Sequence, residues 1–108
     1  MTQPPRRSDI PTPGFYLLRL VRGGPWVGAA IEYNDGQWSA MVDGEWSDQS
    51  SDPWSIPMLD RVHHYGRETT AAEVKFRLGL KRYEELYRPD GTAANPRRPI
   101  NRDKALPF

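Results

Sequence analysis

The sequence predicts an α+β fold. We expect a twisted antiparallel β-meander of four to five strands, open or curled into a partial barrel, with one C-terminal helix packed on it. Two observations lead to this prediction. Short stretches of alternating apolar residues, separated by glycine-containing turns, occupy residues 15–65. One longer stretch, residues 71–87, follows a capping signal and repeats its apolar residues at helical spacing.

The domain organisation follows from length and proline content. A chain of 108 residues supports one domain with a modest core. Four of the 11 prolines lie among the first 13 residues, and four more lie from Pro89 onward. We therefore expect an extended arm over residues 1–13, one domain over residues 14–88 and an extended C-terminal strap over residues 89–108. No apolar run approaches the roughly 20 residues of a membrane span, which favours a cytoplasmic protein.

The strands are predicted from alternation of apolar residues with a period of two. The expected strands are, in order, Phe15–Arg22, Trp26–Tyr33, Gln37–Val42, a short one around Glu45–Ser47, and Met58–Tyr65. Asn34-Asp35-Gly36 and Asp43-Gly44 are turn sequences of tight hairpins. Residues 48–57, rich in serine, aspartate and proline, are expected to form a loop.

The helix is expected to begin after Thr70, which forms a capping box with Glu73, and to end before Pro89. Its continuous apolar stripe, which we expect to lie on the sheet, consists of Ala72, Phe76, Gly79, Leu80, Tyr83, Leu86 and Tyr87. Val74 and Leu78 lie on nearly the opposite side. They are either incidental surface residues or a second contact, most simply with another copy of the chain.

Charges and tryptophans are unevenly distributed. Residues 23–60 contain seven acids, all four tryptophans and neither lysine nor arginine. Residues 1–22 hold four basic residues and one acid, and residues 61–108 hold eleven basic residues and six acids. This pattern suits binding through complementary charge, either to a partner or between the basic strap and the acidic middle. It disfavours duplex DNA, which requires a contiguous basic surface.

No pattern in the sequence supports catalysis. His63 and His64 are adjacent, so on the expected strand they would face opposite sides and could not share a metal ion. No nucleophile motif or phosphate-binding loop of an NTPase is present. We therefore expect a protein without enzymatic activity, cofactor or metal.

The strongest candidate ligand site combines two motifs. Arg22-Gly23-Gly24-Pro25-Trp26 offers a guanidinium group, closely approachable backbone N–H groups and an aromatic face. Arg97-Arg98, between Pro96 and Pro99, offers two forks for a phosphate. Tyr33 or Tyr65 would stack on a base. The alternatives are an ordinary hairpin turn and solvated arginines.

Candidate interface residues lie elsewhere. Trp38 alternates with core residues, whereas Trp46 and Trp54 flank a polar loop and could anchor a partner. The strap ends on Leu106 and Phe108, which we expect to dock in a groove on the same or a neighbouring subunit. Together with Val74 and Leu78, these residues predict a homo-oligomer, most simply a dimer.

Three stretches of the sequence resemble a group of small, uncharacterised proteins encoded by tailed phages and prophages. They are residues 16–27, His64-Tyr65-Gly66-Arg67 leading into the helix, and residues 95–100 closing on Leu106-Pro107-Phe108. The resemblance implies a phage origin and the bacterial host cytoplasm as workplace. Small phage proteins of this size frequently counter bacterial immunity.

These inferences favour a non-catalytic phage accessory protein that counters host defence by sequestering an anionic nucleotide-type immune signal. One alternative is a protein-binding inhibitor that uses the acidic, tryptophan-rich face 32–60 against a bacterial defence complex. Another is a structural or housekeeping role in the phage.

Overall fold

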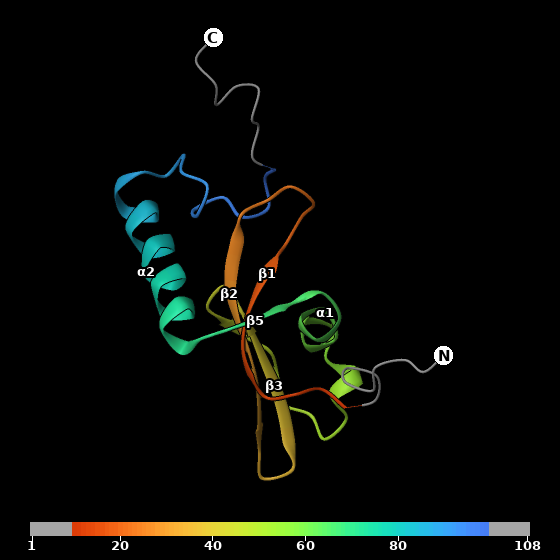
Figure 1. The fold of residues 1–108 in the computed structure, drawn as a ribbon. Helices are drawn as coiled ribbons and strands as arrows, with labels where there is room; N and C mark the ends of the chain where they lie inside the picture. Colours follow the sequence, from red (N-terminus) through yellow and green to blue (C-terminus); the bar gives the residue numbers. More distant parts are fainter. Residues whose placement is uncertain (1–9, 100–108) are drawn as a thin grey trace.

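The computed structural model describes residues 10–99. Most of the N-terminal arm and the end of the strap, including Leu106 and Phe108, lie outside the described residues. The elements are β1 (Gly14–Arg19), β2 (Trp26–Asn34), β3 (Gln37–Val42), β4 (Glu45–Trp46), the 3-10 turn η1 (Pro53–Ser55), α1 (Pro57–Tyr65), β5 (Arg67–Thr69) and α2 (Ala71–Tyr87). One antiparallel sheet in the order β4-β3-β2-β1-β5 separates the two helices (Figure 1).

The predicted α+β class and the meander of β1 to β4 are confirmed. The hairpin turns are of the expected kind, because Asp35 and Gly36 have φ angles of 52° and 77°, and Asp43 and Gly44 have φ angles of 56° and 94°. The sheet is open, with β4 and β5 at its edges, so partial closure into a barrel does not occur.

The predicted fifth strand is wrong, because residues 57–65 form the helix α1. Pro57 occupies the first turn of that helix, where its missing N–H costs nothing, and Asp60 also lies in the first turn. Its buried residues, Leu59, Val62 and His63, are spaced three and four apart, which is helical periodicity. The fifth strand is instead the short β5, which pairs with β1.

The main core lies between the sheet and α1. It is made by alternate residues of β1 to β3 together with the inner side of α1: Tyr16, Leu18, Leu20, Val27, Ala29, Ile31, Ala40, Val42, Ile56, Leu59 and Val62. Leu59 and Val62 are completely buried. Arg61 Nη2 donates to the carbonyl of Leu20 at 2.6 Å, which ties α1 to the end of β1.

The opposite face of the sheet carries α2, and here the predicted orientation of the helix is wrong. Val74 is buried against Ala30 and Met41, with Leu78 packed beside them. The reason is the small size of the sheet residues: a Cβ at Gly28 would lie 2.9 Å from Val74 Cγ1 and 3.2 Å from its carbonyl oxygen. The helix therefore approaches β2 most closely at Val74, and the predicted stripe points outward.

Candidate functional site

After α2, the described part of the strap turns back toward the β1–β2 connection (Figure 1). Two side chains hold it in shape. Glu84 Oε1 accepts hydrogen bonds from the backbone N–H groups of Ala93 at 2.8 Å and Ala94 at 3.3 Å. Asn95 Nδ2 donates to the carbonyls of Pro89 at 2.7 Å and Gly91 at 2.8 Å. The segment is thus an organised loop fastened to the C-terminal half of α2.

This loop contacts the predicted Gly-Gly turn. A Cβ at Gly24 would lie 3.1 Å from the carbonyl oxygen of Pro96, and one at Gly23 would lie 3.6 Å from Pro99 Cβ. Gly23 has a φ of 76°, and the Gly24 N–H donates to the carbonyl of Val21 at 3.0 Å. The glycines therefore serve a tight turn and also admit the strap, so two motifs some 70 residues apart meet.

A pocket of about 360 Å³ lies beneath the loop. Its walls come from β1, the β3–β4 turn, α1, α2 and the strap: Leu20, Val42, Asp43, Glu45, Met58, Lys81, Glu85, Ala94, Asn95, Pro96, Arg97 and Arg98. Leu20, Val42 and Met58 supply an apolar surface, and both arginines are exposed. The pocket therefore lies between the strap and the helices and strands that the strap crosses.

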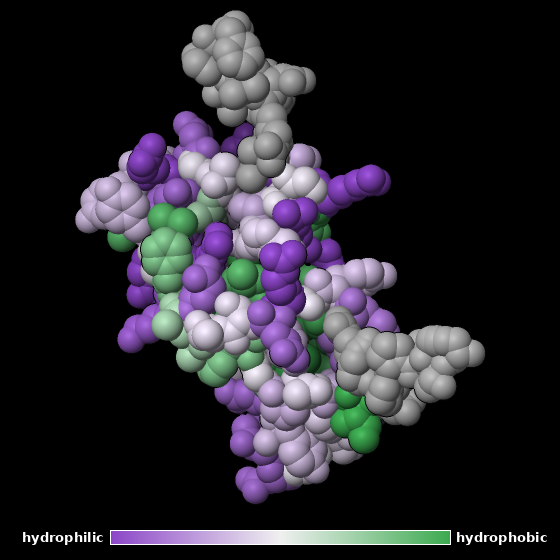
Figure 2. Space-filling model, viewed as in Figure 1, coloured by the Kyte–Doolittle hydropathy of each residue, from purple (hydrophilic) through white to green (hydrophobic). Residues whose placement is uncertain are grey.

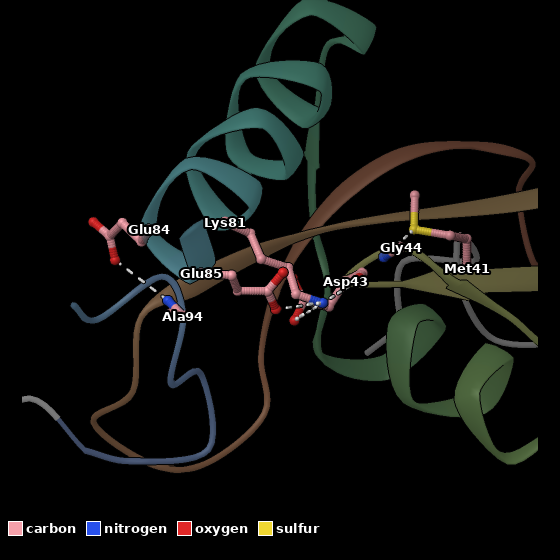
Figure 3. A network of polar contacts seen from close by, with 7 residues as sticks. All are labelled: Met41, Asp43, Gly44, Lys81, Glu84, Glu85 and Ala94. Atoms are coloured by element: carbon pink, nitrogen blue, oxygen red, sulfur yellow. Dashed lines mark hydrogen bonds and ion pairs between the residues drawn. The ribbon is translucent and has the colours of Figure 1, made fainter. Parts of the chain in front are cut away.

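A polar network fixes the wall made by α2 and the β3–β4 turn (Figure 3). Lys81 Nζ donates to the carbonyl of Asp43 at 3.0 Å and lies 3.3 Å from Asp43 Oδ2. The same ammonium group lies 3.8 Å from Glu85 Oε2. The Gly44 N–H donates to Met41 Sδ at 3.0 Å. Lys81 thereby links the turn to the helix.

Asp43 is the only pocket residue whose titration is clearly displaced within the described chain. Burial raises its pKa above the ordinary value of 3.8, and the nearby Lys81 ammonium opposes that rise without cancelling it. The charged side chains that line the pocket are balanced in number, three acidic (Asp43, Glu45, Glu85) against three basic (Lys81, Arg97, Arg98). The pocket is polar and nearly neutral as a whole.

A second pocket of about 310 Å³ adjoins the first. It shares Asp43, Glu45, Lys81 and Glu85 with its neighbour. Its other walls are Gly44, Leu78 and Arg82. The Asp43–Lys81–Glu85 network therefore belongs to both cavities.

The predicted ligand-binding residues are only partly brought together. Arg97 and Arg98 line the pocket, and the turn formed by Gly23 and Gly24, next to the exposed Arg22, contacts their segment without lining it. Trp26 does not line the pocket. Its ring has the guanidinium carbon of Arg19 at 4.3 Å and that of Arg67 at 5.0 Å.

The two tyrosines lie away from this region. Tyr33 is near the other end of β2, packed on Trp38 with ring centroids 4.6 Å apart. Seven residues of strand separate it from Trp26, which amounts to about 23 Å at the usual rise. Tyr65 ends α1 and is 74% exposed. Neither tyrosine lines the pocket.

The predicted interface residues differ in their exposure to solvent. Trp46, on the edge strand β4, is 51% exposed, and Trp54 is 40% exposed with its ring centroid 5.2 Å from that of His63. Val74 is 4% exposed and Leu78 is partly buried on the same sheet. Their prediction as a surface for another copy is therefore wrong, because this protein's own β2 and β3 occupy it.

The sequence reasoning missed Asp43, Lys81 and Glu85. Asp43-Gly44 was interpreted only as a turn. Lys81 and Glu85 follow Val74 by seven and eleven residues, so they lie on the same side of α2. Once Val74 is known to face the sheet, the helical spacing places both charged residues beside it. The sequence alone did not indicate which side of α2 faces the sheet, and the site residues depend on that orientation.

The described residues contain neither a candidate metal cluster nor a membrane-spanning helix. Among residues 10–99, no group of three or more histidine, cysteine, aspartate or glutamate side chains is arranged to hold a metal ion. Neither helix in this part of the chain has the length and apolar character needed to cross a membrane. Comparisons with models of protein families, with curated proteins and with solved structures found no match.

Proposed function

We propose that the protein is a non-catalytic binding protein for a small nucleotide-type ligand, held in the pocket beneath the strap. The observation that carries the proposal is the meeting of the Gly-Gly turn with the strap, which organises Arg97 and Arg98 at the rim of a pocket with an apolar surface. Arginine forks at such a rim can hold a phosphate group through two parallel hydrogen bonds.

The charge balance of the lining narrows the class of ligand. A compound with several phosphates would meet the carboxylates of Glu45 and Glu85 as well as the arginines. A mononucleotide carries a single phosphate together with base and ribose groups that donate hydrogen bonds to carboxylates. Its size also suits a pocket of about 360 Å³, which lies near the lower end of ligand cavities.

The polar groups of the pocket support binding rather than turnover. Lys81 is engaged with Asp43 and Glu85, so the ammonium group is not a free base or nucleophile. Asp43 is held by the same contacts. A protein that binds such a ligand without converting it would lower its free concentration. Sequestration of a nucleotide signal is the role that this property would serve in a host cell.

Thermal unfolding with a ligand panel tests the proposal. The panel contains nucleoside 5′-monophosphates, cyclic mononucleotides, the matching nucleosides without phosphate, and inorganic phosphate. A ligand present at about 100 times its dissociation constant should stabilise the fold by about 2.7 kcal/mol. We expect stabilisation by at least one phosphate-bearing nucleotide and a much smaller effect of its nucleoside. No stabilisation by any nucleotide would overturn the proposal.

A matched pair of variants locates the site. The variant Arg97→Ala/Arg98→Ala removes charged hydrogen bonds worth about 1.5–3 kcal/mol. It should therefore bind the ligand roughly 10- to 100-fold more weakly. Arg88→Ala is the control, because Arg88 is equally exposed and precedes the strap without lining the pocket. Isothermal titration should show unchanged affinity for this control. Equal losses in both variants would indicate a general charge effect instead of a site.

A further inference from the structure

We propose that the exposed apolar stripe of α2 is the interface of a homodimer, in which the α2 helices of two copies lie side by side and parallel. This proposal does not depend on the ligand pocket. It rests on the exposure of the stripe, on the area it offers and on the charges along its two rims.

The stripe is the largest group of exposed apolar side chains on any element of the described chain. Phe76 is 59% exposed, Tyr83 52%, Leu86 67% and Tyr87 68%. Figure 2 shows apolar side chains gathered over the outer surface of α2, at the left of the molecule. Because Val74 faces the sheet, the stripe faces directly away from it. Apolar patches of this extent are the largest that monomeric proteins usually expose, and they often mark interaction sites.

The stripe is centred on a glycine. Gly79 lies midway between Ala72 and Leu86, and a Cβ there would have no atom within 4 Å. Phe76 and Tyr83 flank it on the same face, one turn away in each direction. A small residue between larger ones allows the backbone of a second helix to approach closely. This arrangement suits a helix as the occupant.

The area fits a weak dimer. A large apolar side chain such as an aromatic one buries about 150–250 Å² when fully covered. The four residues of the stripe are only 52–68% exposed, so together they would contribute on the order of 500 Å² per copy. Two copies would bury about 1,000 Å², which is the lower limit for a specific interface. We therefore expect association in the micromolar range, with the aromatic residues as its main anchors.

The rims of the stripe favour a second copy in parallel orientation. Lys75 and Arg82 border one side, and Glu73, Arg77 and Glu84 border the other. Arg77 Nε lies 2.7 Å from Glu73 Oε2, so Glu84 supplies the net negative charge of that rim. In a parallel pair, a twofold axis along the helices brings the basic rim of each copy to the acidic rim of the other. In an antiparallel pair, basic would meet basic. Glu84 Oε1 accepts hydrogen bonds from the backbone N–H groups of Ala93 and Ala94.

The end of the same chain is a poorer occupant. The described strap leaves α2 and crosses to the Gly23 turn, where Pro99 lies against the glycine. The stripe lies on the side of α2 opposite Val74, away from the sheet. Residues 100–108 would therefore have to return around the helix to cover it.

Sedimentation velocity on the full chain tests the interface. We expect a species of twice 12.4 kDa at about 100 µM, a concentration well above a micromolar dissociation constant. Phe76→Ser/Leu86→Ser should shift it to the monomer with an unchanged circular-dichroism spectrum, because both side chains are exposed. Tyr65→Ser is the control, since Tyr65 is 74% exposed outside the stripe, and it should remain dimeric. A monomeric wild-type chain, or a dimeric double variant, would overturn the proposal.

Cysteine cross-linking tests the orientation, because the chain has no cysteine of its own. In a parallel pair, residue 72 of one copy lies opposite residue 72 of the other, so Ala72→Cys should form a disulfide dimer on mild oxidation. Ala71→Cys, its neighbour outside the stripe and equally exposed, should not. A dimer in which only Ala72→Cys/Leu86→Cys cross-links would be antiparallel and would contradict the proposal. A chain that dimerises only after deletion of residues 100–108 would identify that segment as the occupant and would also overturn it.

Discussion

The two faces of the sheet are covered by helices in opposite ways. α1 has only nine residues, yet Leu59 and Val62 are completely buried in a core of eleven residues. α2 has seventeen residues and buries only Val74. The shorter helix is therefore the better anchored one. Helix length does not measure how much a helix contributes to a core.

The difference originates in the sheet. Its α1 face presents large side chains such as Leu18 and Ile31, whereas its α2 face is Gly28 and Ala30 at the contact. α2 is consequently held by the small cluster of Val74 and Leu78 on Ala30 and Met41, and by the Lys81–Asp43 contact. Its most apolar side remains outside. The α1 face stabilises the fold, and we propose that α2 takes part in binding, at the wall of the pocket and at the stripe.

The largest expected effect lies on the α1 face. Leu59→Ala removes a completely buried side chain and should lower the free energy of unfolding by about 2–5 kcal/mol. Val74→Ala, the corresponding truncation on the α2 face, should cost clearly less, because its cluster is small. Urea unfolding followed by tryptophan fluorescence measures both. A larger loss for Val74→Ala would reverse the ranking of the two faces.

A glycine pair examines how closely α2 approaches the sheet. Gly28→Ala should lower the free energy of unfolding by about 1–3 kcal/mol, because its Cβ would overlap Val74 and push α2 away. Gly79→Ala adds the same methyl group on the outer side of α2, where nothing lies within 4 Å. In dilute solution, where the chain is a monomer, it should stabilise by about 0.5–1 kcal/mol through helix propensity. Equal signs for the two substitutions would rule out the close approach as the cause.

Local signals in the sequence predicted the elements that depend on local structure. Asn34-Asp35-Gly36 identified the β2–β3 hairpin. Thr70 placed the start of α2, where its Oγ1 accepts from the Glu73 N–H at 3.1 Å. Alternation along β1 and β2 predicted both strands, and alternate residues of each form part of the main core.

The remaining features depend on tertiary contacts. The sequence predicts a strand over residues 58–65 because Pro57, which begins α1, follows a run of serine, aspartate and proline residues typical of a loop. The orientation of α2 was wrong because the most apolar side of a helix faces a core only when no other contact overrides it. Gly28 provides that contact from another element. Lys81 is not predicted as a site residue for the same reason, because it lies on the same side of α2 as Val74.

The pH dependence of the free energy of unfolding tests whether burial or the Lys81 ammonium group dominates at Asp43. Because burial raises the folded-state pKa of Asp43, the folded state holds this proton more tightly than the unfolded state does. The stability of the wild type relative to Asp43→Asn should therefore fall as the pH rises from 3.8 through the folded-state pKa, and stay level above it. Asparagine also tolerates the positive φ of this position.

Urea unfolding of both proteins across that range measures the difference. Glu68→Gln is the control, because Glu68 is exposed on the edge strand β5. Its curve should run parallel to that of the wild type. A relative stability that rises with pH would mean that the Lys81 ammonium outweighs burial at Asp43. The ion pair would then be the stronger attachment of α2.

The smallest effect is expected on the stripe itself, and it distinguishes an interface from a core. Phe76 is 59% exposed, so Phe76→Ser removes few contacts within the chain and should change the free energy of unfolding by no more than about 0.5 kcal/mol in dilute solution. At concentrations where the wild type dimerises, the same substitution should lower the melting temperature, because association stabilises only the folded state. Thermal unfolding at two concentrations, roughly 100-fold apart, separates these contributions. A loss of stability that is equal at both concentrations would mean that Phe76 packs within its own chain, and the stripe would then belong to the fold like the α1 face.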